Sequence, residues 1–289
     1  METHAVASEF KFSESWSILS DIEKSIKAKI EAVGTPLKNW DVSINYGIKT
    51  GFNDAFIIDS AKREQILSNC QTDEERERTA AIIRPILRGR DIARYTYNWA
   101  NLWLINTHNG IKGSLNRIHI EDYPAIKQHL DCYWDKIKPR ADQGDTPYNL
   151  RNCAYVDDFL KPKIIWKRVG SILRFSYDNQ GFFGLDSTCF ATGNEIAFIC
   201  CLLNSSMGHY LLNGAPRTGT GDLLISVQAV EPIRIPPIPP TLNDTCKNLI
   251  DNILHNPGTT AEDEVDDLIF SLYGLTDEEK EYLIANFRE

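Results

Sequence analysis

A glycine-rich polar turn followed by a short apolar run is the feature that most constrains how this chain folds. The turn reads Gly47-Ile48-Lys49-Thr50-Gly51-Phe52-Asn53-Asp54, and the apolar residues 55–58 follow it directly. Glycines at this spacing suit a tight turn in which the backbone approaches a neighbour closely. The apolar run predicts a short buried strand. We therefore predict a hairpin with Lys49, Thr50 and Asn53 at its polar tip, either as a recognition surface or as a plain solvated turn.

A second turn downstream carries two arginines around a glycine. Arg88 and Arg90 flank Gly89, and Asp91 follows them. A guanidinium group can bind phosphate or guanine through two parallel hydrogen bonds, and the glycine lets the backbone come close. Arg88 and Arg90 are therefore candidate contact residues of this second basic turn. The alternative is that Arg90 pairs with Asp91 or with a neighbouring acid, as exposed ion pairs do for little energy.

Charge is unevenly distributed along the chain. The formal net charge of −9 disfavours nucleic acid when it is taken alone. Residues 84–174, however, hold 16 lysines and arginines against 9 aspartates and glutamates, a net charge of +7, whereas residues 241–289 hold 3 against 12, a net charge of −9. The basic middle predicts a contact surface. Its further candidate residues are Arg151, Lys163, Lys167, Arg168 and Arg174, and Arg217 follows in a turn rich in threonine and glycine.

The pattern of apolar residues predicts an α+β fold. Short apolar runs predict strands over residues 102–105, 163–168 and 173–177 and a further hairpin over residues 182–190. Because side chains alternate along a strand, only about half of the cations in the two later strands face one side. A run that is apolar on several faces predicts one buried helix over residues 196–212.

Capping signals and prolines mark further boundaries. Thr72 with Glu75 predicts the start of a helix over residues 73–83, which Pro85 would end. A proline-rich run that ends at Pro240 predicts an extended segment and a domain boundary. We therefore predict a disordered start and linker helix over residues 1–36, a mixed-sheet recognition domain with surrounding helices over 37–240, and a small helical C-terminal appendage over 241–289.

The sequence carries no signal for a membrane span, export or catalysis. No apolar run approaches the roughly 18 residues that span a bilayer, and the polar N-terminus lacks a signal-peptide core. The seven cysteines have no regular spacing, which predicts reduced thiols and a cytoplasmic protein. The glycine pattern of a dinucleotide site, the Gly-x-Ser-x-Gly motif and the ligand spacing of a zinc site are missing. We therefore predict no catalytic residue and no metal site on this chain.

Several segments together carry a family resemblance, which extends from about residue 14 to the end of the chain. The segments are residues 47–56, 83–92, 123–126, 145–151, 161–166, 203–206, 235–239 and 267–276. Jointly they resemble the TaqI-like C-terminal specificity domain. That domain is the target-recognition part of type IIG restriction-modification enzymes and of related adenine-specific DNA methyltransferases.

The resemblance implies a domain that recognises double-stranded DNA, in which basic residues position the backbone and loop side chains read base edges. The implied DNA contacts are Lys49, Thr50, Asn53, Arg88, Arg90, Arg151, Lys163, Lys167, Arg168, Arg174 and Arg217. Family members also carry an Asn/Asp-Pro-Pro-Tyr/Phe catalytic loop and a glycine-rich S-adenosylmethionine site, and neither is found here. The chain is therefore expected to have no catalysis or cofactor of its own. S-adenosylmethionine and Mg²⁺ are expected for a parent enzyme whose methyltransferase or endonuclease domain is the partner.

Two alternatives remain open from the sequence. The chain could be the specificity part of a phage-defence DNA methyltransferase that lacks nuclease activity. In a different class, it could be a protein-docking module that uses its acidic helical tail as an interface. A DNA reader should gather the basic middle segment on one contiguous face, whereas a docking module need not.

Overall fold

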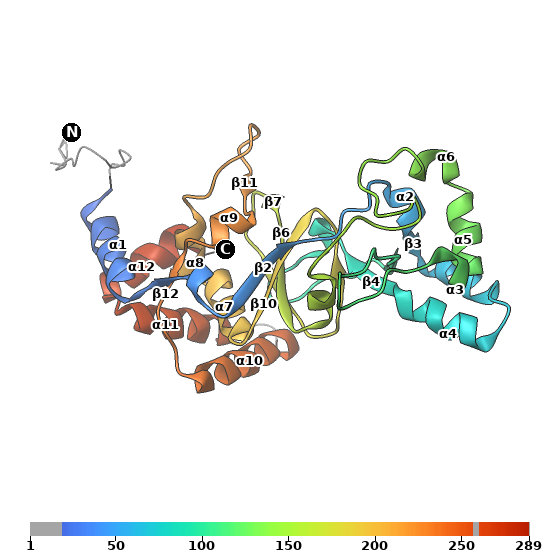
Figure 1. Ribbon diagram of the computed structural model, residues 1–289. Coiled ribbons are helices and arrows are strands. Elements are labelled where there is room, and N and C mark those ends of the chain that lie inside the picture. Colours follow the sequence, from blue (N-terminus) through green and yellow to red (C-terminus); the bar gives the residue numbers. More distant parts are fainter. Residues whose placement is uncertain (1–18, 257–259, 289) are drawn as a thin grey trace.

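The computed structural model describes residues 19–256 and 260–288. The disordered start predicted for the first residues lies outside them. The described residues form an α+β fold, as predicted. Figure 1 shows an elongated molecule, with a group of helices at one end, a sheet in the middle and a second lobe of helices and strands at the other end. Within the described ranges, we find no helix with the length and apolar character that crossing a bilayer requires.

An antiparallel sheet forms the centre of the molecule. Its strands, in spatial order, are β2 (Val42–Tyr46), β10 (Thr188–Gly193), β6 (Lys163–Lys167) and β8 (Phe175–Asp178). Strands β6 and β8 confirm two of the predicted strands. The side chains of Ile164 and Trp166 in β6 belong to one hydrophobic core, whereas Ile165 belongs to another. Because neighbouring side chains of a strand point to opposite faces, the central sheet separates the two cores.

A second sheet lies in the lobe at the far end. Its order is β3 (Ile57–Asp59), β5 (Leu102–Ile105), β4 (Ile83–Leu87) and β9 (Phe183–Gly184), and only the last pair is parallel in this sheet as described. Strand β5 confirms the strand predicted over residues 102–105. The helices of this lobe are α2 (Asn53–Phe56), α3 (Ser60–Ser68), α4 (Asp73–Ile82), α5 (Pro124–Asp131) and α6 (Trp134–Ile137) (Figure 1).

The two predicted hairpins are instead crossings between the sheets. Strands β2 and β3 lie in different sheets, and so do β9 and β10. The glycines allow these crossings to approach each other, since a Cβ at Gly47 would lie 2.0 Å from the carbonyl oxygen of Leu185. The N–H groups of Gly47 and Ile48 donate to the carbonyl oxygens of Thr188 and Gly184. The glycine pattern therefore reflects contact between two crossings and not a hairpin turn.

Helix and strand ends in this lobe differ from prediction in two places. Helix α4 begins as predicted, with Thr72 Oγ1 accepting from the N–H of Glu75 at 3.1 Å. It ends at Ile82, and Pro85 lies inside β4. The strand predicted over residues 55–58 begins two residues later, because the short helix α2 precedes it. Both differences lie at the first residues of β3 and β4, and both strands pair with β5. Tertiary pairing, rather than local sequence, therefore sets where these strands begin.

The remaining helices lie on the other side of the central sheet. The single helix predicted over residues 196–212 is two helices, because Ser205 has an extended backbone and caps the second of them. The helices are α1 (Asp21–Val33), α7 (Ile196–Asn204), α8 (Ser206–Leu212), α9 (Val227–Val230), α10 (Pro240–His255), α11 (Ala261–Tyr273) and α12 (Asp277–Phe287). Two short strand pairs complete the fold, β1 (Thr35–Pro36) with β12 (Arg234–Ile235) and β7 (Val169–Gly170) with β11 (Leu223–Leu224).

The helical C-terminal part shares its hydrophobic core with earlier elements. Ile26 of α1, Phe198 of α7, Phe270 of α11 and Leu283 of α12 are fully buried in the same cluster. The boundary that we predicted at residue 240 therefore separates elements that pack into one core.

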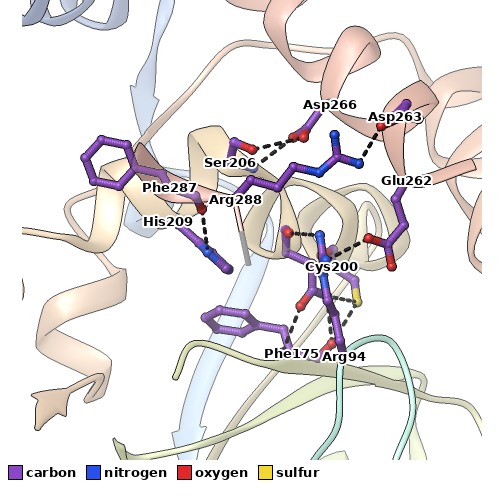
Figure 2. A network of polar contacts seen from close by, with 11 residues as sticks. Arg94, Phe175, Cys200, Ser206, His209, Glu262, Asp263, Asp266, Phe287 and Arg288 are labelled. Carbon is purple, nitrogen blue, oxygen red and sulfur yellow. Dashed lines mark hydrogen bonds and ion pairs between the residues drawn. The ribbon is translucent and has the colours of Figure 1, made fainter. Parts of the chain in front are cut away.

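A polar network also joins the C-terminal helices to the body of the fold (Figure 2). Arg94 donates to Glu262 Oε2 and to the carbonyl oxygen of Asn204, each at 2.7 Å. Asp266 accepts from the N–H and the hydroxyl of Ser206, at 2.8 and 2.9 Å. Figure 2 shows these contacts lying side by side between α7, α8 and α11. Two acidic residues of α11, Glu262 and Asp266, therefore form hydrogen bonds with the body of the fold.

Candidate nucleic-acid interface

Two adjoining pockets open next to the crossing that follows β2. The first has a volume of about 460 Å³ and is lined by residues 46–49 and 151–155 together with Arg168 and Asp186. The second has a volume of about 600 Å³ and is lined by residues 109–113, 115–117 and 152–154. Because residues 152–154 line both, the two pockets form neighbouring parts of one surface.

Three of the predicted cations meet at the first pocket. Lys49, Arg151 and Arg168 come from three separate segments of the chain. Between two of them lies Asp142, which accepts from Lys49 Nζ at 2.9 Å and from Arg151 Nη1 at 3.2 Å. The hydrogen bond from Lys49 holds the pKa of Asp142 below its usual range, and Arg151 adds to this effect. A carboxylate therefore occupies the place between two cations where a phosphate could bind.

A buried arginine fastens the loop that carries Asp142. Arg140 is only 6% exposed, and its guanidinium donates to the carbonyl oxygens of Thr50, Pro147 and Asn149. Burial lowers the pKa of Arg140 to about 10. Since Thr50 belongs to the crossing after β2, Arg140 ties the two sides of the first pocket together.

The turn at Gly89 lies against the end of β6. The N–H of Gly89 donates to Ser187 Oγ at 2.9 Å, and the N–H of Arg168 donates to the carbonyl oxygen of Ser187 at 3.0 Å. A Cβ at Gly89 would lie 2.9 Å from Cγ of Lys167. Ser187 therefore links the Gly89 turn to the end of β6, and the side chains of Arg90 and Lys167 are exposed there.

Arg88 is engaged within its own turn. Its guanidinium donates to both carboxylate oxygens of Asp91, at distances of 2.7 to 3.3 Å. The N–H of Arg88 donates to the same carboxylate at 2.8 Å. The alternative in which Asp91 pairs with Arg90 is therefore wrong, because Arg88 takes that place. Arg90 is the exposed arginine of the turn.

Two of the predicted contacts are buried and leave the candidate set. Thr50 is 1% exposed, and its hydroxyl donates to Asn53 Oδ1 at 2.6 Å. Lys163 is 0% exposed, forms an ion pair with Asp178 and donates to the carbonyl oxygen of Phe159 at 2.6 Å. The physical reason for Lys163 is its place at the start of β6, where both faces of the strand are covered. Neither side chain can reach a ligand in this conformation.

The remaining predicted residues are exposed but lie outside the linings of both pockets. Asn53 begins α2, and its side-chain oxygen Oδ1 accepts from the hydroxyl of Thr50. Arg174 lies in the turn before β8. Arg217 donates to the carbonyl oxygen of Gly221 at 3.0 Å, in the loop before β11. Figure 1 shows this loop, in orange next to β11, projecting from the body of the molecule.

The second pocket holds candidate residues that the sequence did not single out. Its lining includes the amides of Asn109, Asn116 and Asn152 and the cations Lys112 and Arg117. The available signal was a polar loop between β5 and α5, and a polar loop alone does not distinguish a ligand site from a solvated surface. Amide and cationic side chains are the groups that pair with adenine and guanine edges. The second pocket therefore suits contacts with bases.

In the part of the chain that the structure describes, no three His, Cys, Asp or Glu side chains come together in a way that could hold a metal ion. The seven cysteines are all free. Burial raises the pKa of the Cys153 thiol, which lines both pockets, to about 11, so it is not an activated nucleophile at neutral pH.

Comparison with known proteins adds three findings. Residues 84–219 match the model of the TaqI-like C-terminal specificity domain. A solved structure of the type IIL restriction-modification enzyme MmeI in complex with DNA is similar over 88% of this chain and 36% of that chain, with a TM-score of 0.61 and 13% identity. The type IIG restriction endonuclease BpuSI is similar over 93% of this chain and 33% of that chain, with a TM-score of 0.54 and 15% identity.

The similarities cover only part of the solved structures. The chain spans about a third of the length of the two solved structures, and at 13% and 15% identity the likeness shows a shared fold. No curated protein matches the chain. The matched segment contains the whole lining of the second pocket and, apart from residues 46–49, that of the first. Residues 84–219 thus match the family model of the TaqI-like C-terminal specificity domain, within a fold that this chain shares with parts of the restriction-modification enzyme MmeI and the restriction endonuclease BpuSI.

Proposed function

We propose that this chain reads a sequence in double-stranded DNA as the specificity part of a restriction-modification enzyme. The observation that carries the proposal is the convergence of Lys49, Arg151 and Arg168 on one pocket, directly beside a pocket lined by amides. Cations that contact phosphates position a protein on the duplex, and side chains that reach base edges specify the sequence. The two neighbouring pockets provide both kinds of group.

Binding in this proposal depends strongly on salt. Each cation that neutralises a phosphate releases counterions, so affinity falls as salt rises. The net charge of −9 keeps non-specific affinity low, at or below the usual range of about 10⁻⁴ to 10⁻⁶ M at physiological salt. Sequence-specific contacts must then supply most of the discrimination between sites.

The chemistry in this proposal belongs to a partner domain of the parent chain. A methyltransferase domain would extrude the target adenine from the duplex into its own pocket while this domain holds the site. S-adenosylmethionine and Mg²⁺ are proposed as ligands of the parent outside this chain. The parent would act in the cytoplasm in phage defence, either with an endonuclease or, in the alternative, as a nuclease-free methyltransferase. Methyl transfer to DNA by this chain alone would contradict the proposal that it lacks catalysis.

The alternative of an acidic docking module has weaker support. In the C-terminal helices, Glu262 pairs with Arg94, Glu279 pairs with Lys29, and Asp266 accepts from Ser206. These three carboxylates are engaged within the fold and are not available to a basic partner, whereas others in the same helices, such as Asp267 and Glu278, are exposed. We therefore keep DNA recognition as the proposed function.

The test is a salt titration of binding between the chain and duplex DNA, by fluorescence anisotropy. We expect Lys49→Ala and Arg168→Ala each to weaken binding to all sequences and to lower the slope of log K against log salt by about one unit. The control is Lys247→Ala, because Lys247 is an exposed lysine of α10 that pairs with Asp244. Affinity that does not change with salt, or an equal effect of the control, would overturn the proposal.

A further inference from the structure

Asn152 lies in the wall that the two pockets share, and it is exposed. Its chain neighbour Arg151 lines the first pocket only, whereas Asn152 also lines the pocket of amides. In the DNA-reading function proposed above, on which this inference rests, Asn152 therefore lies where phosphate contacts give way to base contacts.

The orientation of the neighbouring amide of Asn109 is fixed by the backbone. Asn109 Oδ1 accepts from the N–H of Asp145 at 2.9 Å, and a backbone N–H can only donate. The other end of the amide must therefore be Nδ2, which donates to Asp145 Oδ1 at 2.9 Å and to Asn152 Oδ1 at 2.5 Å. Arg117 holds the second oxygen of Asp145 at 2.8 Å.

This arrangement also fixes the amide of Asn152. Its side-chain oxygen Oδ1 accepts from Asn109 Nδ2, so its own Nδ2 points away from Asn109. Within residues 19–256 and 260–288, the Nδ2 of Asn152 has no hydrogen-bond partner. An NH₂ group has two donors and no acceptor. Asn152 therefore offers two donors to a ligand, while Asn109 already bonds to one of the two lone pairs of its amide oxygen.

Such a group discriminates among bases in the major groove. Asparagine recognises adenine through two hydrogen bonds, which require both its oxygen and its nitrogen, and here Asn109 competes for that oxygen, whereas both donors of Nδ2 are free. Guanine presents two acceptors, N7 and O6, whereas cytosine presents the N4 donor. We propose that Asn152 is a specificity-determining residue that reads the major-groove edge of a guanine, and that Asn109 is the positioning residue that orients it.

The backbone at Gly144 lies close to the side-chain amide of Asn109. A Cβ at Gly144 would lie 2.4 Å from Asn109 Oδ1, so only glycine leaves room for the amide of Asn109 beside Asp145. Asn109 thus contacts Asp145 and Asn152, both far from it in the chain, and its role is to hold Asn152 rather than to touch DNA.

The experiment uses the whole chain and begins with selection from a randomised duplex library, followed by binding to single-base variants of the selected site. Asn152→Ala should lower discrimination at one guanine position by about 5- to 150-fold and leave the other positions unchanged. Asn152→Asp should keep the contact with Asn109 but offer an acceptor to the DNA, so preference at that position should shift toward cytosine.

Asn109→Ala supplies the test of the positioning role. It should relax preference at the same base position as Asn152→Ala, and the double variant should lose no more than either single variant. Asn194→Ala, which removes an exposed amide that donates to Asp41, is the matched control and should leave the profile unchanged.

The outcomes separate this inference from the proposed function. If the chain shows no salt-dependent binding to duplex DNA, the proposed function fails. If it binds and Asn152→Ala weakens all sequences alike, Asn152 contacts a phosphate, and only the inference fails. A retained guanine preference in Asn152→Asp, or an unchanged profile in Asn109→Ala, would also overturn the inference.

Discussion

Arg94 reaches from the body of the fold to α11, where its Nη1 donates to Glu262 Oε2 at 2.7 Å. Its Nη2 donates at the same distance to the carbonyl oxygen of Asn204, the last residue of α7. One guanidinium thus spans two helices, and its side chain is 18% exposed. The helices that Arg94 joins share one hydrophobic core with the central sheet. The C-terminal helices and the central sheet should therefore unfold together.

Replacement of Arg94 should therefore destabilise the whole chain. We expect Arg94→Ala to lower the free energy of unfolding by about 1.5–3 kcal/mol, the usual contribution of hydrogen bonds to a charged group. Denaturant unfolding followed by circular dichroism would measure it as a lower midpoint in a single transition. Lys247→Ala is the control, since its exposed pair on α10 should contribute less than about 1 kcal/mol. Two separate transitions in the wild type would contradict joint unfolding.

His209 makes stability depend on pH. Its Nδ1 donates to the carbonyl oxygen of Phe287 at 3.0 Å, and its Nε2 is buried without a partner in the described part of the chain. Burial, with a smaller effect of nearby Arg94, lowers the pKa of His209 from 6.5 to about 4. As the pH falls below 6.5, the unfolded chain takes up this proton before the folded chain does. The free energy of unfolding should therefore fall between pH 6.5 and pH 4, by up to about 3 kcal/mol.

The measurement is the unfolding midpoint of wild type and His209→Asn across this pH range. The asparagine amide can replace the Nδ1 donor but does not titrate, so the variant should lose less stability on acidification. Burial also lowers the pKa of His108 and His129. The difference between the two proteins, and not the wild-type curve alone, is therefore the quantity to compare. Parallel pH profiles would show that His209 is not the group responsible.

The limits of prediction are clearest in β6. Lys163 and Lys167 are four residues apart and so share one face of the strand, yet one is fully buried and the other is exposed. Alternation tells which side chains share a face, but not where along the strand that face leaves the core. At Lys163 that point is set by the carbonyl oxygen of Phe159 and the carboxylate of Asp178, which only the tertiary structure brings to the start of β6.

Long-range contacts account for the other differences. Local signals were sufficient for the start of α4 at Thr72 and for the strand β5, because a cap and an apolar run act over a few residues. The glycines around Lys49 were visible too, but Gly47 approaches Leu185 and Gly51 approaches Asp142, both far away in the chain. The amide pocket was missed for the same reason, since Asn109 and Asn152 meet only after the loops fold together.

The two lysines of β6 should respond differently to replacement. Lys163→Met should lower the free energy of unfolding by about 3–5 kcal/mol, because it leaves the buried carboxylate of Asp178 without its cation. Lys167→Met should change stability by less than about 0.5 kcal/mol but lower the salt slope of DNA binding by about one unit. Unfolding curves and salt titrations of both variants measure this. If the Lys163→Met protein folds and its salt slope of DNA binding is lowered, Lys163 contacts DNA, which contradicts this prediction.

Asp142 should weaken the binding of this chain to DNA of any sequence. Its carboxylate lies between Lys49 and Arg151, so a phosphate that approaches these cations must displace it or be repelled by it. We expect Asp142→Asn to tighten binding to all duplexes and to steepen the salt slope by about 0.9 for each cation that gains a phosphate. Asp244→Asn removes the same charge next to Lys247 on α10 and should leave both quantities nearly unchanged. Weaker binding by Asp142→Asn would instead mean that the carboxylate holds Lys49 and Arg151 in place for the phosphate.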